Sequence, residues 1–350
     1  MKPILFPALV MAVLASDGAA AQPVQPPPAV THPVAELLAS APALTLDNGA
    51  LRAVIRPPDA QKGFYRGTRF DQAGVITSLK AGDTEFYGPW FERTAPEVLD
   101  YTYVGDELVA GPDSAITGPA EEFAPLGFAP KPGLFVKPGV GVLRQPDSKP
   151  YDKYRHYEIV DGGRRSLRAT TNSVTFTQTV NGAGYAYDYE KIITLLPGTT
   201  TMEISHILRN TGDKPIDTSV YDHNFLTLVP GNANIRVSFP FAVKIDAAHA
   251  ANPPPADLIA VQANSLVWLR AQKNKERLSF PVTGFGPGAD DYDIRITSPT
   301  GAGVEIQGDA PITRLNIFAL DRVQAVEPFI AIHVPPGGEQ RWRYIYTFSP

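Results

Sequence analysis

The chain has 350 residues, a formal net charge of −5, 35 prolines, 29 glycines and no cysteine. The mild acidity and the absence of a basic stripe argue against nucleic acid as a partner. The lack of cysteine excludes disulfides, thiolate metal sites and a cysteine nucleophile, and no motif indicates a metal or another cofactor.

The N-terminal residues predict an export signal. Lys2 precedes the apolar run 4–15, and the small residues 18–21 suit a signal peptidase, so we expect cleavage after Ala21. The run is shorter than the roughly 20 apolar residues of a transmembrane helix, and no other segment suggests a membrane span. We therefore expect a periplasmic or secreted protein.

The next segment, 22–40, predicts a proline-rich linker, because its prolines favour an extended chain with little apolar surface to pack. One short helix-like piece covers residues 34–41. From residue 41 to 350 no repeat and no break in composition divides the chain, so we expect one large domain.

That domain has the pattern of β-strands, in which apolar and polar residues alternate between clusters of Gly, Pro, Asn or Asp. The predicted strands are 53–56, 75–79, 173–180, 185–195, 201–209, 219–228, 234–239, 266–270, 293–297, 314–319, 329–334 and 341–348. They indicate an all-β sandwich of antiparallel sheets. The segment 91–150 is too rich in proline and glycine for regular sheet, and we expect an irregular insert that walls or covers a binding cleft.

The first candidate site residues lie in a glycine-punctuated loop at 63–71. Tyr65, Arg66, Arg69 and Asp71 occur there, and two guanidinium groups can bind a carboxylate or sugar hydroxyls. Alternatively, an ion pair between Arg69 and Asp71 only shapes the turn. Later in the chain, His156 lies between two tyrosines, as a second cleft histidine or as a surface one.

The strongest candidate is His223, in the predicted strand 219–228. Alternation places Tyr221, His223 and Phe225 on one face of this strand, and Asp222 and Asn224 on the other. A neutral imidazole beside a tyrosine can act as a general acid near neutral pH. A structural histidine that bonds a backbone carbonyl is the alternative, and the surrounding polar residues favour function.

A lone carboxylate, Glu327, precedes an otherwise apolar strand. Burial there would raise its pKa and make it a base near neutrality, whereas a glutamate at a strand end can also be simply solvated. His206 lies on an apolar strand face, which favours a hydrogen-bonded core histidine. The tryptophans serve either the core or sugar stacking: Trp90, Trp268 and Trp342.

Several catalytic motifs are absent from the sequence. There is no P-loop, no G-x-S-x-G elbow, no H-E-x-x-H and no dinucleotide fingerprint after a strand. These absences argue against phosphoryl transfer, serine hydrolysis and nicotinamide chemistry.

Three stretches, in their order along the chain, resemble the aldose 1-epimerase (galactose mutarotase-like) superfamily: YRGTRFDQAGVITSL (65–79), NTGDKPIDTSVYDHNFLTL (210–228) and EPFIAIHVPPGGEQRWRYIYTF (327–348). The resemblance implies a β-supersandwich that handles a mono- or oligosaccharide. It also implies that His223 protonates the ring oxygen, that Glu327 takes the proton of the C1 hydroxyl, and that Arg69 binds the substrate. The further candidates for substrate binding are Arg66, Tyr65, Asp71, His156, Tyr221 and Asn224.

The sequence departs from the family pattern in two places. Only His156 is available for the family's second histidine, and the sugar-binding aspartate has several candidates: Asp246, Asp290, Asp291 and Asp293. Two other functions fit the same residues. One is a polysaccharide lyase that acts on a uronate-containing glycan, with Tyr221 or His223 abstracting the C5 proton. The other is a non-catalytic carbohydrate-binding protein. No oligomeric state is indicated.

Overall fold

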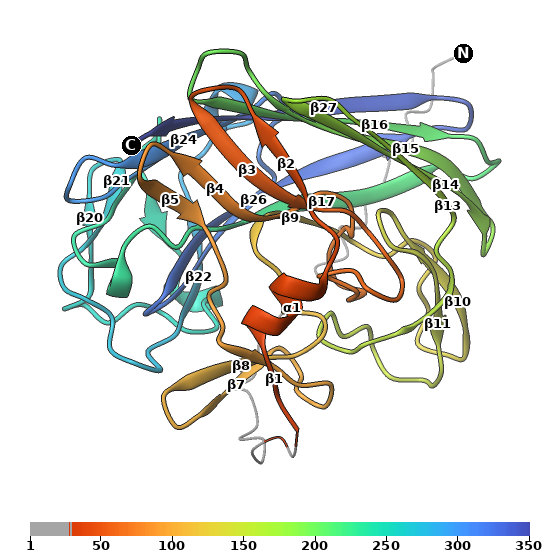
Figure 1. Cartoon of the computed structure of the whole chain (residues 1–350), viewed down its shortest axis with the longest axis horizontal. Helices are drawn as coiled ribbons and strands as arrows, with labels where there is room; N and C mark the ends of the chain where they lie inside the picture. Colours follow the sequence, from red (N-terminus) through yellow and green to blue (C-terminus); the bar gives the residue numbers. More distant parts are fainter. Residues whose placement is uncertain (1–27, 29) are drawn as a thin grey trace, which may run out of the picture.

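The computed structural model describes Pro28 and residues 30–350, which form stacked, almost entirely antiparallel β-sheets (Figure 1). The predicted all-β class is confirmed, and each predicted strand corresponds to a strand of the structure. The predicted signal peptide lies outside the described residues. No helix in the described part of the chain is long and apolar enough to cross a membrane.

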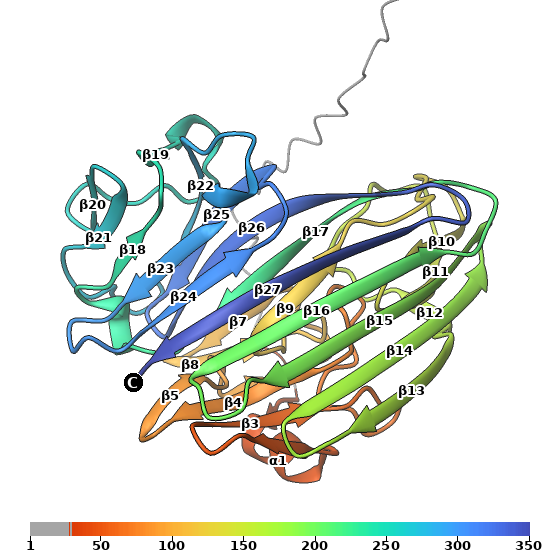
Figure 2. The same ribbon diagram turned by 90° about the horizontal axis from the view of Figure 1, so that it is seen from above.

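The largest sheet forms one layer of the sandwich and lies across the strands β17 and β26 when seen from above (Figure 2). Its long strands alternate buried and half-buried residues, as expected for a sheet with one covered face. Its order is β13 (Arg164–Ala169), β14 (Ser173–Gly182), β15 (Tyr185–Leu195), β16 (Thr201–Asn210), β27 (Glu339–Ser349), β24 (Gly303–Gly308), β23 (Asp293–Thr297), β18 (Arg236–Ser238), β21 (Ser265–Trp268) and β20 (Ile259–Gln262).

A second sheet lies beneath it and has both faces covered. In β17 (Ile216–Phe225), Ile216 and Val220 belong to the main core against the largest sheet, whereas Tyr221 and Phe225 belong to a second apolar cluster on the opposite face. The alternation of side chains along each strand therefore sorts residues between two interiors. The order of this sheet is β19 (Lys244–Ile245), β22 (Leu278–Thr283), β25 (Arg314–Leu320), β26 (Val323–Val334), β17 (Ile216–Phe225) and β9 (Gly118–Phe123).

Three smaller sheets complete the domain. The first contributes apolar side chains to the main core, the next forms a small apolar cluster of its own around Phe135 and Leu143, and the last contributes Leu108 to the second cluster. Their orders are β2 (Leu44–Asp47), β3 (Leu51–Arg56), β4 (Val75–Ala81) and β5 (Thr84–Tyr87); β10 (Gly133–Lys137), β11 (Gly141–Gln145) and β12 (Glu158–Asp161); and β1 (His32–Pro33), β6 (Arg93–Thr94), β8 (Glu107–Ala110) and β7 (Tyr101–Val104). Short 3-10 turns are η1 (Pro230–Asn232), η2 (Ala247–His249) and η3 (Ala289–Asp291).

The helix α1 (Val34–Ser40) corrects the expected boundary of the linker. Its residues Val34, Leu37 and Leu38 pack against the second apolar cluster, so the end of the 22–40 segment belongs to the packed domain. The apolar residues recur every three to four positions, which gives even this short helix one buried side.

The segment 91–150 is more regular than its composition predicts. It contains β6 to β11, and β9 joins the six-stranded sheet by pairing with β17. Pro119 fits in β9 because this strand is the edge of its sheet, where a missing N–H costs no ladder bond. The expectation of an irregular insert is therefore wrong for β9, which supplies Glu121 and Glu122 to the two interiors.

Candidate functional site

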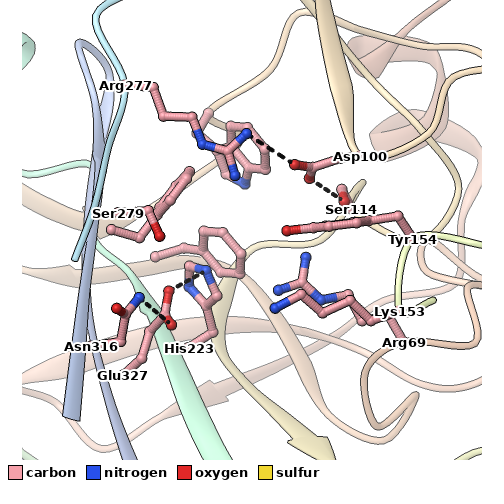
Figure 3. Close-up of a pocket in the computed structure, with 13 residues that line it drawn as sticks. Arg69, Asp100, Ser114, Lys153, Tyr154, His223, Arg277, Ser279, Asn316 and Glu327 are labelled. Atoms are coloured by element: carbon pink, nitrogen blue, oxygen red, sulfur yellow. Dashed lines mark hydrogen bonds and ion pairs between the residues drawn. The ribbon is translucent and has the colours of Figure 1, made fainter. Parts of the chain in front are cut away.

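A cavity of about 50 Å³ lies on the second face of the six-stranded sheet (Figure 3). Side chains of β17, β22, β25 and β26 line it from the sheet, and the loops before β4, β6, β7, β9, β12 and β22 supply the rest of its lining. The cavity is thus assembled from segments that are far apart in the sequence.

Three polar side chains form a row across neighbouring strands in this cavity. Continuing the register of β17 and β26 past the pair Tyr221 and Phe329 brings His223 opposite Glu327, and Asn316 of β25 pairs with Glu327 on its other side. His223 Nε2 lies 3.0 Å from Glu327 Oε1, and Asn316 Nδ2 donates to Glu327 Oε2 at 3.0 Å. The strand ladder therefore holds the histidine and the carboxylate in direct contact.

Glu327 lies inside β26 and not at the start of a strand as the sequence suggested. The strand begins at Val323. Proline favours strand edges, so Pro328 gave the false indication in the sequence that the strand starts near it. Glu327 is 7% exposed, and burial raises its pKa, although Lys153, Asn316 and Arg69 act in the opposite direction. The carboxyl is therefore closer to neutrality than a solvated glutamate.

His223 lies in an aromatic environment. Its ring stacks on Phe225 at 3.6 Å between centroids, and Phe225 stacks on Trp90 at 5.5 Å. His223 is 3% exposed, and its Nδ1 has no hydrogen-bond partner among the described residues. Burial, assisted by the charges of Arg69 and Lys153, lowers the pKa of His223 well below its usual value, which favours the neutral imidazole.

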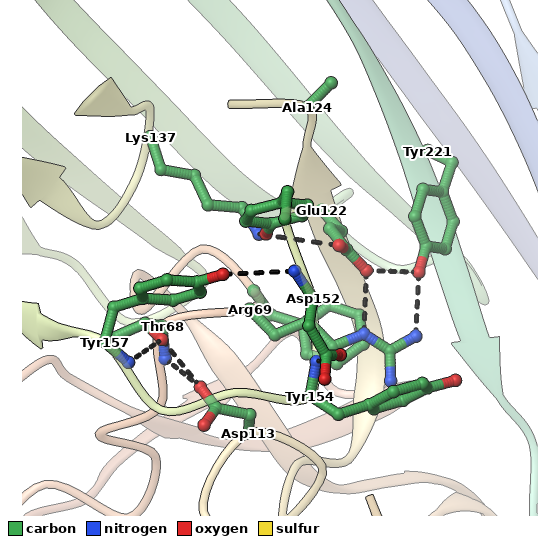
Figure 4. Close-up of polar contacts among 12 residues, drawn as sticks. Thr68, Arg69, Asp113, Glu122, Ala124, Lys137, Asp152, Tyr154, Tyr157 and Tyr221 are labelled. Carbon is green, nitrogen blue, oxygen red and sulfur yellow. Dashed lines mark hydrogen bonds and ion pairs between the residues drawn. The ribbon is translucent and has the colours of Figure 1, made fainter. Parts of the chain in front are cut away.

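Arg69 is fixed at the cavity by a buried network (Figure 4). Its Nε donates to Glu122 Oε2 at 2.7 Å, and its Nη2 donates to the Tyr221 hydroxyl at 2.9 Å. Glu122 also accepts from Tyr221 and from Lys137. Gly67 keeps the loop of Arg69 tight, because a Cβ there would lie 2.4 Å from the Tyr65 hydroxyl.

Further charges surround the cavity. Lys153 and Tyr154 line it from the loop before β12, and Arg277 lines it from the loop before β22. Arg277 Nη1 lies 3.6 Å from Asp100 Oδ2, and Ser114 donates to the other oxygen of Asp100 at 2.7 Å. In the described part of the chain, no group of three or more His, Asp or Glu residues is placed to hold a metal ion.

The structure brings three predicted site residues into one cavity. His223, Glu327 and Arg69 all line it, and Trp90 joins them as the outer ring of the aromatic stack. Tyr221 does not line the cavity but holds Arg69 from behind. Trp268 and Trp342 are core residues, as is His206, whose Nε2 lies 2.8 Å from Glu121.

The remaining predicted residues lie elsewhere. Tyr65 is buried and its hydroxyl bridges backbone groups, while the exposed Arg66 donates to a neighbouring carbonyl. Asp71 and Asn224 point into the main core, where they accept from Tyr189 and Tyr346, respectively, so the turn-shaping pair of Arg69 and Asp71 is absent.

The second histidine and the sugar-binding aspartate of the family pattern also differ from expectation. His156 contacts the buried Asp113 at 3.0 Å, and its half-exposed ring does not line the cavity. None of the four expected aspartates lines it either: Asp246, Asp290, Asp291 and Asp293. Asp100 is the aspartate found there.

Sequence reasoning missed several cavity residues, although some signals were present. Tyr154 and Lys153 lie two and three residues before His156, so the sequence pointed to the correct loop but to the wrong residue in it. Asn316 occupies a polar position between the apolar residues of β25, which marks the face opposite the main core. Asp100 and Arg277 lie in loops without periodicity, and only the folded chain brings them together.

Solved structures with a similar fold exist. A putative aldose 1-epimerase from Escherichia coli matches with a TM-score of 0.51 and 14% identity over 88% of this chain and 99% of that one. A galactose mutarotase-like protein from Lactobacillus casei matches with a TM-score of 0.50 and 12% identity over 88% and 100%. A protein from Synechocystis matches with a TM-score of 0.50 and 12% identity over 88% and 96%.

At these identities the likeness establishes the fold alone. The chain has the galactose mutarotase-like fold, which confirms the expectation drawn from the three sequence stretches. No protein-family model matches the chain, and no curated protein matches its sequence.

Proposed function

We propose that this protein is an aldose 1-epimerase-like enzyme that interconverts the anomers of a sugar, with His223 and Glu327 as its acid and base. The observation that supports this most is the 3.0 Å contact between His223 Nε2 and Glu327 Oε1 in a buried cavity of a galactose mutarotase-like fold. Arg69 and Asn316 are the neighbouring groups that bind sugar hydroxyls.

The reaction requires a base and an acid that are close neighbours. One proton leaves the C1 hydroxyl and another reaches the ring oxygen, and both oxygens are attached to C1. Ring opening, rotation about the bond from C1 to C2 and reclosure then exchange the anomers. Neighbouring strands of one sheet position the two side chains for this purpose.

The pair supplies both roles through one shared proton. Burial disfavours the charged form of both groups, so it lowers the pKa of His223 and raises the pKa of Glu327. Transfer of the shared proton from Oε1 to Nε2 creates a carboxylate and an imidazolium, which are a base and an acid, without any exchange with water. The substrate then enters between them, so that Glu327 faces the C1 hydroxyl and His223 faces the ring oxygen.

Substrate binding requires the cavity to widen. Its volume of about 50 Å³ is small for a hexose. Some of the side chains that line it must therefore move apart. A compact cavity of this kind suits a monosaccharide and not an extended polymer.

Anomer exchange is measured by polarimetry or NMR on freshly dissolved α-glucose and α-galactose. We expect acceleration over buffer, and a loss of roughly 10²- to 10⁴-fold in kcat when Glu327→Gln removes the base. The variant Glu339→Gln, at an exposed position of β27, is the matched control and retains full activity. Absence of acceleration with every aldose, or full activity of Glu327→Gln, would falsify the proposal.

The alternatives lack a specific observation in their favour. The Tyr221 hydroxyl is held by Glu122 and Arg69 behind the cavity, so it is poorly placed to abstract a proton as a lyase base. Binding of a sugar without exchange would favour a non-catalytic protein. Periplasmic or secreted localisation stays a prediction, and fractionation of producing cells tests it.

A further inference from the structure

One cation of the cavity has no carboxylate partner. Lys153 lines the cavity, and no carboxylate oxygen of the described residues lies within ion-pair distance of its Nζ. Its contact is with the ring of Tyr154, whose centroid lies 5.4 Å from Nζ. Burial lowers the pKa of Lys153, but Tyr154 and the more distant carboxylates of Glu122 and Glu327 outweigh it and keep the ammonium charged, although no carboxylate contacts it directly.

A second cation has unfilled hydrogen-bonding capacity. The side chain of Arg277 is 18% exposed, and its Nε is buried with no hydrogen-bond partner among the described residues. Its ion pair with Asp100, at 3.6 Å, is too long for a hydrogen bond. A guanidinium in this state is ready to bind an anion with its planar array of donors.

These two cations belong to one side of the cavity. Tyr154 lies between Arg277 and Lys153 in Figure 3, with Glu327 and His223 on the opposite side. The Arg69 guanidinium also lies 5.0 Å from the Tyr154 ring, but Glu122 already balances its charge. Lys137, the other cation at Glu122, does not line the cavity. Among the cations that line the cavity, Lys153 and Arg277 therefore have no carboxylate oxygen of the described residues within hydrogen-bonding distance.

We infer that the cavity takes an aldose that carries a carboxylate, a uronic acid, with the carboxylate between Lys153 and Arg277. This inference rests on the proposed anomer exchange. In a hexuronic acid the carboxylate is attached to C5, next to the ring oxygen, so C1 reaches His223 and Glu327 while the carboxylate reaches the opposite wall. A single negative charge matches the one ammonium of the cavity without a direct ion-pair partner, whereas a phosphate ester carries nearly two charges and is bulkier.

The test compares anomer exchange of galacturonate, glucuronate, galactose, glucose and glucose 6-phosphate by NMR at neutral pH. We expect kcat/KM to be roughly 10- to 100-fold higher for a uronate than for the corresponding neutral aldose, the effect of one charge-assisted hydrogen bond. Lys153→Met removes most of this preference. Lys149→Met, at an exposed position four residues earlier, retains it.

The outcomes separate this inference from the proposed function. Exchange of galactose or glucose without a uronate preference, or a preference that survives in Lys153→Met, overturns the inference and leaves anomer exchange intact. Faster exchange of glucose 6-phosphate than of both uronates overturns the carboxylate assignment. Calorimetric binding of uronates, weakened in Lys153→Met, together with no exchange of any sugar, supports the carboxylate site and refutes anomer exchange. The comparison of substrates on the unmodified protein stands even where a variant fails to fold.

Discussion

Two buried groups of charges lie back to back on the two faces of β9 and β17. Glu121 and Glu122 are adjacent in sequence yet point to opposite faces, and the same holds for Asp222 and His223. We call the group facing the cavity the pocket cluster, and it consists of Arg69, Glu122, His223 and Glu327. The group facing the largest sheet is the core cluster, and it consists of Glu121, Lys191, His206 and Asp222.

The residues of the core cluster are buried and contact one another. Lys191 contacts Glu121 and donates to the Ala73 carbonyl at 3.0 Å, and His206 contacts the other oxygen of Glu121 at 2.8 Å. Burial alone would raise the pKa of Glu121, but Lys191 and His206 outweigh it and hold that pKa at about 2. The charge of Glu121 is therefore matched by protein partners, whereas Asp222 has no cation within ion-pair distance among the described residues.

The pocket cluster differs from the core cluster because some of its hydrogen-bonding groups face the cavity. Among the described residues, unpartnered polar atoms occur in both clusters, at His223 Nδ1 in one and at His206 Nδ1 and Asp222 Oδ1 in the other. Only the pocket cluster lines the cavity, through Arg69, His223 and Glu327. Two clusters with similar charged residues thus have different roles in the molecule. Internally balanced charges stabilise a fold, whereas charges left incomplete at a cavity are available to a ligand.

The largest expected effect comes from exchanging the two histidines of these clusters for alanine, one at a time. His223→Ala removes the proposed acid, and we expect kcat for anomer exchange to fall roughly 10²- to 10⁴-fold with little change in stability. His206→Ala should lower stability, because Glu121 loses a partner and the ring of Trp342 loses its stack, yet spare kcat per folded molecule. Thermal unfolding and NMR exchange rates measure the two effects.

The division between the clusters fails if His206→Ala lowers kcat per folded molecule as much as His223→Ala does. A further control is His333→Ala in β26, where the histidine is exposed and pairs with Asp217. That variant should alter neither quantity appreciably.

Most of the fold was predictable because it depends on local alternation. Strands such as β14, β15 and β16 have one covered face, so period-two patterns reveal them. The strand β9 was missed because all its residues are buried and it contains Pro119, which leaves neither alternation nor β-propensity to recognise. The packing of α1 was missed because it depends on a cluster built from distant segments.

The candidate site was predictable only in part, for a similar reason. His223 and Glu327 occur on strands with clear parity, and the family resemblance assigned them roles. The partner of Arg69 was missed because Glu122 lies 53 residues away, whereas Asp71 is close in sequence but faces the other interior. Ion pairs between loops follow tertiary topology, which composition and periodicity do not contain.

A second prediction applies the same substitution to Lys191 of the core cluster and to Lys137, which contacts Glu122 of the pocket cluster. Lys191→Met leaves Glu121 and the nearby Asp71 without their cation, and we expect the free energy of unfolding to fall by about 3–5 kcal/mol. Lys137→Met should cost less, because Glu122 keeps Arg69 and Tyr221 as donors. Urea unfolding at pH 7 gives both values, and equal losses would show that the clusters are equally dependent on their lysines.

The smallest predicted effect is a pH dependence that comes from Asp222 in the core cluster. Burial, reinforced by the charge of Glu121, raises the pKa of Asp222 to about 8, compared with about 3.9 for an unfolded aspartate. Between these values the folded state keeps a proton that the unfolded state releases, so stability falls as pH rises, by about 1 kcal/mol per pH unit.

Asp222→Asn cannot ionise and should lack this slope in urea unfolding at pH 5, 6, 7 and 8. Asp217→Asn, at an exposed position of the same strand, should keep it. Parallel curves for the protein and Asp222→Asn would mean that the core cluster tolerates a further negative charge, and that enclosure does not distinguish it from the pocket cluster.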